Sequence, residues 1–549
     1  MSKGKTFRNV ATAPSRRSAH DLSYSKVFTG DFGQLYPVFV EPCIPGDTFK
    51  LSFDGVVRFQ PLVAPLMHEI NLSCHYFFVP YRLFTSKLKE LNLDFNWEDF
   101  ISGGDDGEDN QTPPVIPINT WTSGHLYDYL YDCVPNGTIL NDFKPIAFPA
   151  LAYNLIYNDY YRDENLIEEV HILNSTKIHN RAWTKDYFTS ALPFQQRGIS
   201  PSIPIRILNQ GLDYEQPNNV DIQARAMAPS GTNSDFLYWG RQGDEVPNHA
   251  HFVNTSTNNV ISGTGQYGNI FTRITPAIGE QFSSYLKLDL DIVADWDIND
   301  MRTAWQTQRF LEAMARVGSR YTEYIQGIWN KNIGDKTLQR PEYIGGVKTP
   351  VVISEVLQTS ETTSPNSPQG NMAGHGITAT STRIGTYHCN EWGVIIGLLS
   401  VMPKPSYHQG LDKRWSAKTR YDYPNPYFMH LSEQPISRGE LYFTGTSQDN
   451  ENFGGWQGIW DEYRIKHDSI SGLIRTSEFE HWSLSRKFAN APTLNQSFIE
   501  CDAITGGATN PLKRCFAVPS EPGLIITAGT RCTAIRPIPF IAEPGLVDH

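Results

Sequence analysis

The chain has 549 residues and a formal net charge of −12, with 40% hydrophobic, 12% aromatic and only 19% charged residues. Its length exceeds the usual size of one core, so we expect several domains or one core with large insertions. The acidic balance argues against a protein whose whole surface binds nucleic acid, while the low charge and the many aromatic residues predict contact with other copies or partners.

The chain begins with a basic segment that lacks apolar periodicity. Residues 1–20 contain no Asp or Glu, and their cations are Lys3, Lys5, Arg8, Arg16 and Arg17. Such a segment is either a frayed terminus or an arm that faces nucleic acid. Residues 28–46 contain three prolines and are predicted to be an extended lead-in, so that residues 1–46 precede the core.

Two long strands are predicted at 47–60 and 68–79, where apolar residues alternate with polar ones. The residues on their apolar faces include Phe49, Leu51, Phe53, Ile70, Leu72 and Cys74. A helix could not bury either set on one face. Two strands with one apolar face each need a second sheet, so we predict an all-β core built as an antiparallel sandwich. Further strand-like runs occur at 386–402, 469–488 and 524–536.

An acidic region follows the second strand. Residues 90–142 contain eleven Asp and Glu but no Lys or Arg. The densest part, in the loop 94–109, consists of Asp105, Asp106, Glu108 and Asp109. Carboxylate oxygens suit calcium, but the spacing does not match an EF-hand loop. The interpretation that we favour is a solvated acidic loop.

Helical insertions are predicted between the early and late strands, within about 83–345. A short helix on the sandwich is expected within 146–168. A longer helix begins at Asp297, which can cap it, and ends at Gly318. Its apolar face, with Met301 and Trp305, predicts packing against the sandwich or a neighbouring subunit.

Two further stretches have the composition of loops. Residues 201–285 are rich in Gly, Asn, Ser, Thr and Pro and are predicted to form a surface protrusion, and residues 358–385 are predicted to form a loop. Gly263, Gly265 and Gly268 match G-x-G-x-x-G. The strand and helix that a dinucleotide site requires are not expected around them, so we interpret these glycines as hairpin turns.

A basic-aromatic segment spans residues 404–427. Its cations are Lys404, Lys413, Arg414, Lys418 and Arg420, and its rings are Tyr407, Trp415, Tyr421, Tyr423 and Tyr427. Cations that meet phosphates, beside rings that stack on bases, are typical of single-strand binding. An aromatic subunit contact with a rim of Lys and Arg is an equally good interpretation, and the two are compatible.

The sequence contains no catalytic signature. It has no G-x-S-x-G elbow, no P-loop and no H-E-x-x-H motif. A glycosidase carboxylate pair stays open only because Asp and Glu are plentiful. We therefore expect a protein that is not an enzyme and that uses no cofactor or metal.

Stretches that share residues with one family are spread over nearly the whole chain. They are residues 18–20, 76–80, 186–193, 339–343, 409–422, 460–464 and 498–500. Together they resemble the major capsid protein of microviruses, the small single-stranded DNA bacteriophages, and specifically of their gokushovirus branch. The resemblance weakens at 201–280 and 358–385.

The resemblance implies a coat protein with an eight-stranded antiparallel jelly-roll sandwich that carries long loop and helical insertions. Sixty copies would form a T=1 icosahedral shell around circular single-stranded DNA. The implied partners are a small basic DNA-binding protein, an internal scaffolding protein and a host surface receptor that the protruding loops of 201–285 contact. The protein would belong to the virion and assemble in the bacterial cytoplasm. The residues expected to face DNA are Lys3, Lys5, Arg8, Arg16, Arg17, Lys413, Arg414, Trp415, Lys418, Arg420 and Tyr421.

The alternative is a jelly-roll carbohydrate-active enzyme or carbohydrate-binding module, with aromatic platforms and a carboxylate pair. Neither a signal-peptide core nor an apolar run of membrane length is present, so we expect a soluble chain that is not exported by the Sec route. This expectation counts against the alternative, in which the basic arm also has no role. Size-exclusion chromatography with negative-stain microscopy separates the two, because closed particles exclude a monomeric enzyme.

We predict that all seven cysteines are unpaired. Their number is odd, they contain no C-x-x-C pair, and the implied cytoplasmic assembly is reducing. Mass spectrometry after alkylation without reductant should find free thiols at Cys43, Cys74, Cys133, Cys389, Cys501, Cys515 and Cys532. A stoichiometric disulfide would contradict the prediction.

Overall fold

The computed structural model describes residues 17–103, 111–132, 134–141, 143–201, 223–227, 234–238, 250–254, 259–263, 298–318, 320–357 and 372–541. The chain divides into two compact units. Residues 1–199 together with 310–549 form the first, and residues 200–309 form the second.

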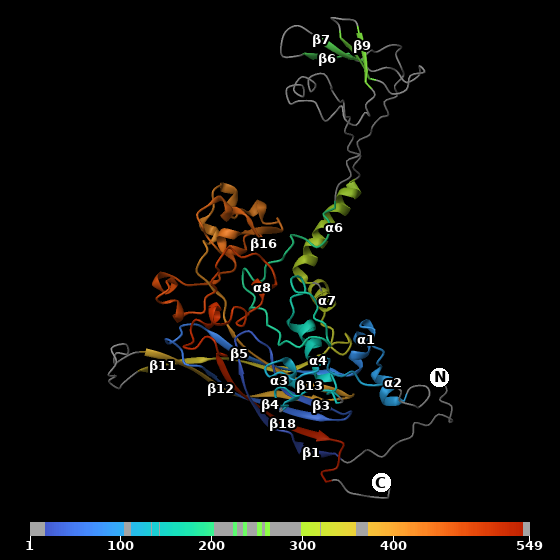
Figure 1. Ribbon diagram of the computed structural model, residues 1–549, viewed down its shortest axis with the longest axis vertical. Helices are drawn as coiled ribbons and strands as arrows, with labels where there is room; N and C mark the ends of the chain where they lie inside the picture. The colour runs from blue at the N-terminus through green and yellow to red at the C-terminus, as the bar shows by residue number, and fades with distance from the viewer. Residues whose placement is uncertain are drawn as a thin grey trace, which may run out of the picture. The chain divides into compact units, whose positions relative to one another are not determined.

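Two antiparallel sheets organise the first unit (Figure 1). The six-stranded sheet has the order β1-β18-β4-β12-β11, and β2 also pairs with β18. Its strands are β1 (Ser18–Asp21), β2 (Tyr24–Gly30), β4 (Thr48–Phe59), β11 (Val352–Leu357), β12 (Met372–His388) and β18 (Leu524–Arg536). The four-stranded sheet has the order β10-β5-β13-β3. Its strands are β3 (Tyr36–Cys43), β5 (Ile70–Pro80), β10 (Glu342–Pro350) and β13 (Gly393–Pro403).

The two sheets bury their apolar faces against each other. Phe49 and Phe53 of β4 lie in one buried cluster with Leu72 and Tyr76 of β5. The Tyr76 hydroxyl also bonds the hydroxyl of Thr530 on β18 at 2.7 Å, which joins the sheets through the core. The predicted strands at 47–60, 68–79 and 524–536 are confirmed, and so is an antiparallel β core.

The prediction that residues 28–46 are only an extended lead-in is wrong, because the end of β2 and all of β3 belong to the two sheets. The prolines of β3 misled the prediction. Pro37 and Pro42 lie on a strand at the edge of the four-stranded sheet. An edge strand tolerates proline because one side of its backbone needs no ladder partner.

Two other predictions from composition also fail. Residues 358–371 lie outside the described part of the chain, but β12 occupies most of the remaining predicted loop 358–385. Its glycines serve close packing: a Cβ on Gly376 would lie 2.7 Å from the ring of Phe59. The predicted strand at 469–488 instead forms short 3₁₀ turns at Gly472–Arg475 and Glu480–Trp482.

A helical layer covers the outer face of the four-stranded sheet. It consists of α1 (Arg82–Glu90), α2 (Trp97–Ser102), α3 (Leu126–Tyr131), α4 (Phe148–Ile156) and the π-helical turn η1 (Tyr157–Tyr161). Phe77 of β5 and Ile396 of β13 share a buried cluster with Leu151 of α4. This confirms the short helix expected on the sandwich. The outer face of the six-stranded sheet is different, since outward residues of β4 such as Lys50 and Arg58 are exposed.

A third cluster of buried residues, around Tyr187, Tyr407 and Phe453, supports the region from 404 to 500. The helices and strands of this region are short. They are β14 (Ser406–Tyr407), β15 (Glu433–Ser437), β16 (Asn452–Gly458), β17 (Asp468–Ser469) and α8 (Gln496–Ile499), with 3₁₀ turns between them.

The second unit contains an antiparallel sheet of β6 (Gln223–Met227), β7 (Ser234–Tyr238), β8 (Ala250–Asn254) and β9 (Asn259–Gly263). Gly265 and Gly268 lie outside the described residues, and the outward projection of 201–285 stays a prediction.

The long predicted helix is present as α6 (Ile298–Val317), which is followed by α7 (Tyr321–Trp329). Ala315 is the buried residue of α6, whereas Met301 and Trp305 are 48% and 71% exposed. What packs on this face of α6, the sandwich or a neighbouring subunit, stays a prediction.

The described cysteines are buried thiols. Cys43, Cys74, Cys389, Cys501, Cys515 and Cys532 are free. Burial raises the pKa of Cys515 and of Cys532 to about 12. Cys133 lies outside the described residues.

The shared core predicts a large cost for a cavity between the sheets. Leu72 is fully buried there, so Leu72→Ala should lower the free energy of unfolding by about 3 kcal/mol. The matched control is Val352→Ala on the edge strand β11, where 64% exposure predicts a change within about 0.5 kcal/mol. Urea unfolding of the soluble subunit measures both, and equal effects would argue against this core.

Candidate functional site

The basic-aromatic segment folds into short turns rather than a strand or a long helix. Its 3₁₀ turns are Lys413–Trp415, Arg420–Asp422 and Pro426–Phe428. Side chains cap two of them, because Asp412 accepts from the Arg414 amide and Asn425 accepts from the Tyr427 amide. Tyr407, however, belongs to the buried core, and Lys404 pairs with Asp468 at 2.7 Å.

The cations of these turns are partly engaged within the chain. The Arg414 guanidinium binds both carboxylate oxygens of Asp412 and lowers the pKa of that carboxyl. Arg420 lies 4.9 Å from the centre of the Tyr421 ring. Lys413 donates to the Pro435 carbonyl at 3.1 Å, and Lys418 donates to the Asn450 side chain at 3.2 Å. These cations therefore have positions fixed by local contacts.

The rings of the segment face solvent. Trp415 is 77% exposed and Tyr427 is 91% exposed. A cavity of about 430 Å³ lies beside them, lined by Lys413, Lys418, Tyr421, Phe428, Leu431 and Trp460. Large exposed rings with cations at their edge suit a macromolecular partner. Trp, Tyr and Arg are enriched among the interface residues that contribute most of the binding free energy.

The basic arm is described only at its end. Lys3, Lys5, Arg8 and Arg16 lie outside the described residues. Arg17 immediately precedes β1 and donates to the Gly46 carbonyl, next to Asp47. The arm is thus joined to the six-stranded sheet.

The structure places Arg17, the described end of the arm, apart from the basic-aromatic segment. Within the first unit, Figure 1 shows β1 and β18 on one side of the sandwich and β16, with its neighbouring turns, on the other. At the end of α6, Arg316 pairs with Glu433 at 2.6 Å and bonds Ser432 at 3.1 Å, which joins this helix end to β15 beside the basic-aromatic segment.

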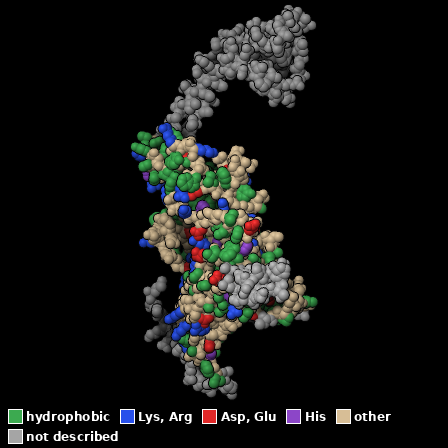
Figure 2. Space-filling model, turned by 90° about the vertical axis from the view of Figure 1, so that its left-hand side faces the viewer, with side chains coloured by type: hydrophobic (Ala, Val, Ile, Leu, Met, Phe, Trp, Pro, Cys, Tyr) green, Lys and Arg blue, Asp and Glu red, His purple; other side chains and the backbone are tan. Residues whose placement is uncertain are grey.

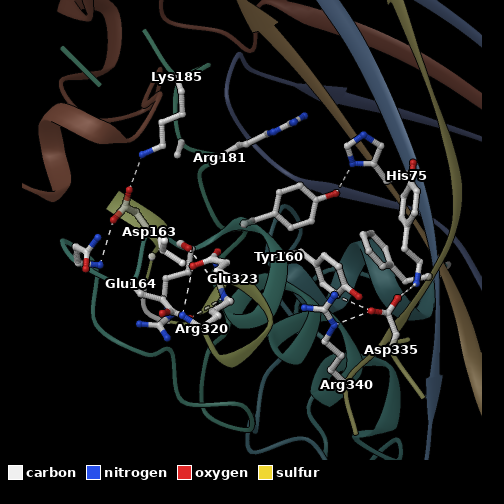
Figure 3. Close-up of a pocket in the computed structure, with 18 of the residues that line it drawn as sticks. His75, Tyr160, Asp163, Glu164, Arg181, Lys185, Arg320, Glu323, Asp335 and Arg340 are labelled. Carbon is white, nitrogen blue, oxygen red and sulfur yellow. Dashed lines mark hydrogen bonds and ion pairs between the residues drawn. The ribbon is translucent and has the colours of Figure 1, made fainter. Parts of the chain in front are cut away.

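A cavity of about 900 Å³ lies in the first unit near the return of this insertion (Figure 3). Its walls come from distant parts of the chain, with His75 on β5, Tyr160 on η1, Glu323 on α7 and Tyr343 on β10. The Tyr161 hydroxyl bonds Nδ1 of His75 at 2.7 Å. Burial, with a smaller contribution from the Arg181 charge, lowers the pKa of His75 to about 4.

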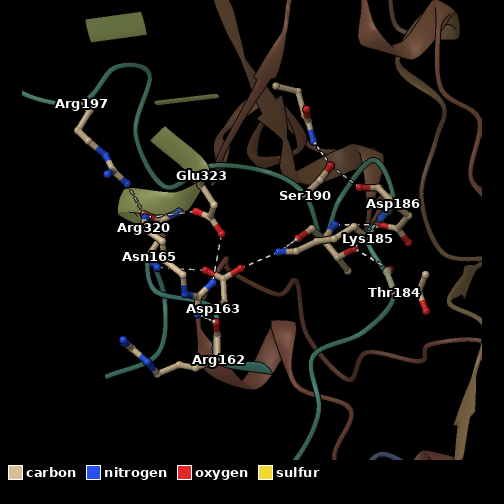
Figure 4. Close-up of polar contacts among 12 residues, drawn as sticks. Arg162, Asp163, Asn165, Thr184, Lys185, Asp186, Ser190, Arg197, Arg320 and Glu323 are labelled. Atoms are coloured by element: carbon tan, nitrogen blue, oxygen red, sulfur yellow. Dashed lines mark hydrogen bonds and ion pairs between the residues drawn. The ribbon is translucent and has the colours of Figure 1, made fainter. Parts of the chain in front are cut away.

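Arg320, at the start of α7, contacts η1 and the residues that follow it; Figure 4 shows Arg320 beside Glu323 and Arg162. Its guanidinium pairs with Glu164 at 2.6 Å and with Glu323 at 3.2 Å. The same group donates to the carbonyl oxygens of Asn158 at 3.1 Å and Arg162 at 2.9 Å. One side chain therefore fixes the end of the insertion to the helical layer.

Two more ion pairs line the cavity. Lys185 pairs with Asp163 at 2.6 Å, and Arg340 pairs with Asp335 at 2.6 Å. Each described carboxylate in this wall thus has a cationic partner, an arrangement that stabilises the junction of four elements rather than performing acid-base chemistry. Hydrophobic periodicity does not indicate these pairs: Arg320 and Glu164 are 156 positions apart, and Lys185–Asp163 and Arg340–Asp335 lie in irregular turns.

Among the described helices, none combines the length and the apolar character needed to cross a membrane. Within the same residues, no cluster of His, Cys, Asp and Glu has the arrangement of a metal site. The predicted acidic loop is not tested, since Asp105, Asp106, Glu108 and Asp109 lie outside the described ranges.

The lowered pKa of His75 predicts acid sensitivity. Between pH 6.5 and 4, His75 binds a proton in the unfolded chain but stays neutral in the folded chain. The free energy of unfolding therefore falls as the pH decreases through this window, by up to about 3 kcal/mol. His75→Gln should remove this contribution from the pH dependence of urea unfolding. Tyr161→Phe should retain it, because burial rather than the hydroxyl contact is the main cause; an unchanged pH dependence in His75→Gln would contradict the assignment.

Comparison with known proteins agrees with a structural role. The family model described as capsid protein (F protein) matches residues 8–546. Capsid protein VP1 of Chlamydia phage 1 is 33% identical over 98% of this chain and 97% of its own length. The VP1 proteins of Bdellovibrio phage phiMH2K, 31% identical over 98% and 97%, and of Spiroplasma virus 4, 26% identical over 96% and 95%, are also similar. The resemblance to microvirus capsid proteins is confirmed, and nothing in these relatives supports the carbohydrate-active alternative. The chain belongs to the phage capsid protein (F protein) family, and it is a structural capsid protein rather than an enzyme.

Proposed function

We propose that this protein is the major coat subunit of a 60-copy, T=1 icosahedral virion shell that encloses circular single-stranded DNA. The observation that carries the proposal is the aromatic surface that the chain leaves uncovered. In addition to Trp415 and Tyr427, the exposed rings include Trp305 of α6 and Trp329 of α7. Figure 2 shows hydrophobic side chains exposed in several groups over one face, with Lys and Arg beside them. Burial of such groups against further copies gives a favourable assembly free energy.

The strand order supports a jelly roll as the proposed topology. The six-stranded sheet contains β2-β18-β4-β12 as neighbours, and the four-stranded sheet contains β3-β13-β5-β10. In chain order these eight strands alternate between the sheets except at β5 and β10, which pair in the same sheet, in the pattern of two interlocked Greek keys. On this proposal β1 and β11 extend the larger sheet, and long insertions follow β5 and β13.

The genome contact is assigned first to the basic arm, with Lys3, Lys5, Arg8, Arg16 and Arg17. An acidic chain of net charge −12 has few cations to offer phosphates, so a small basic DNA-binding protein is a proposed partner, together with an internal scaffolding protein. The turn-rich residues 201–285 are proposed to face outward and to contact a host receptor. Assembly is proposed to take place in the host cytoplasm.

Lys413, Arg414, Trp415, Lys418, Arg420 and Tyr421 remain candidates for DNA contact. Their place beside β15 and the end of α6 also suits a contact between subunits. The two uses predict different effects of a substitution. Loss of a DNA contact lowers the amount of packaged DNA, whereas loss of a subunit contact prevents formation of the shell.

Purified subunits should form closed particles in size-exclusion chromatography and negative-stain microscopy. A chain that stays monomeric at high concentration, with all structural partners of the phage present, would refute the proposed shell.

The arm is tested by Arg16→Ala with Arg17→Ala. We expect particles to form normally but to retain less nuclease-protected DNA, because the variant loses two counterions of the phosphates. The comparison variant is Lys418→Ala with Arg420→Ala, which also removes two cations but on the other side of the sandwich. Normal packaging by the arm variant would show that Arg16 and Arg17 do not hold DNA.

A further inference from the structure

Three cations gather on the open face of the six-stranded sheet. On β4, Ser52 lies directly between Arg383 of β12 and Arg531 of β18. Two residues away on the same face of β4, Lys50 lies between Thr386 and Thr533. All three cationic side chains are exposed. We call Lys50, Arg383 and Arg531 the sheet cations.

Hydroxyl groups surround the sheet cations. The outward neighbours on the three strands are Ser52, Ser381, Thr386 and Thr533. A shallow cavity of about 660 Å³ continues along the face past Ser381, Thr527 and Arg531. Side chains of this kind donate hydrogen bonds to phosphate oxygens, whereas base stacking requires aromatic rings. The face is therefore suited to a nucleic-acid backbone rather than to its bases.

The sheet cations are incompletely neutralised by the chain. Arg531 pairs with Asp54, which lowers the pKa of the Asp54 carboxyl, and it donates to Ser381 at 2.7 Å. Arg383 donates to the Thr386 hydroxyl at 3.3 Å. Among the described residues, neither Lys50 nor Arg383 has a carboxylate within ion-pair distance. Like charges on adjacent strands repel each other, and a polyanion would relieve this repulsion.

Arg17, the last cation of the arm, lies next to the strand that carries Lys50. Ser18 of β1 pairs with Arg536 of β18, and the adjacent Ile535 pairs with Thr48 of β4. Arg17 thus enters the sheet at the end of β4 that carries Lys50. The helical layer covers the four-stranded sheet instead, and Arg320 fixes the return of the insertion to that layer. The open face and the root of the insertion therefore lie on opposite sides of the sandwich.

We propose that the sheet cations, with their neighbouring hydroxyls, bind successive phosphates of single-stranded nucleic acid, continuing the contact that the arm begins. This inference rests on the proposed genome-enclosing function and adds to it a surface built from rigid strands. Neighbouring strands lie about 4.8 Å apart, so Arg383 and Arg531 originate about 10 Å from each other across β4. Binding to this surface does not depend on base sequence.

The test uses the soluble full-length subunit and a fluorescently labelled oligothymidylate, with binding measured by anisotropy over a series of salt concentrations. The variant is Lys50→Gln with Arg383→Gln, which leaves the Arg531–Asp54 pair intact. Each lost phosphate contact reduces the slope of log K against log salt by about 0.7, so we expect a decrease of about 1.4 together with weaker binding. Its melting temperature in low salt should be equal to or above that of the parent, since a repulsion has been removed.

Two control variants make the result specific. Lys348→Gln removes an exposed lysine from β10 of the other sheet and should leave the slope unchanged. Lys50→Arg with Arg383→Lys preserves the charges and should retain binding. An unchanged slope in the Gln variant, or an equal decrease in Lys348→Gln, overturns the inference.

Other outcomes separate this inference from the proposed function. If the Gln variant binds the oligothymidylate normally but no longer forms particles, the face contacts another protein subunit and the inference is wrong. If the parent subunit forms no closed particles at all, the proposed shell fails, whereas oligothymidylate binding still decides the role of the sheet cations.

Discussion

The structure depends on the burial of two apolar sheet faces against each other. Phe49 and Phe53 of the larger sheet meet Leu72 and Tyr76 of the smaller one in a single cluster. β13 is buried on both faces, because the helical layer covers its other side. Each long excursion of the chain begins and ends at a strand held by this core. A change in the length or form of an insertion is therefore expected to leave the register of β4, β12 and β18 unchanged.

The positions of the charged side chains follow from this packing of layers. One face of the sandwich is covered by helices and by the junction at Arg320, where carboxylates and cations neutralise each other. None of the described residues forms such a layer on the opposite face, where Lys50 and Arg383 are exposed. The two faces of the subunit therefore differ, since one is covered by helices and the other is open. Such a subunit suits a closed shell, whose inner and outer surfaces have different partners.

Sequence patterns predicted the core where one face alternates, as in Phe49, Leu51 and Phe53, because burial on one side imposes a period of two. They failed for β12, where Gly and Thr are needed for close strand packing, and for β3, where prolines are tolerated at an edge. The candidate surfaces were predicted only in part. Runs of cations such as Lys413 and Arg414 are visible in the sequence, whereas Lys50, Arg383 and Arg531 meet only through strand register.

The buried thiols have a consequence for the lifetime of an assembled particle. A thiol reacts with oxidants mainly as the thiolate, and burial raises the pKa of Cys74, Cys501 and Cys532 well above neutrality. Cys74, Cys501 and Cys532 are therefore poorly reactive toward oxidants at neutral pH. The described part of the subunit therefore has no covalent cross-link, and its durability rests on the packing of its core.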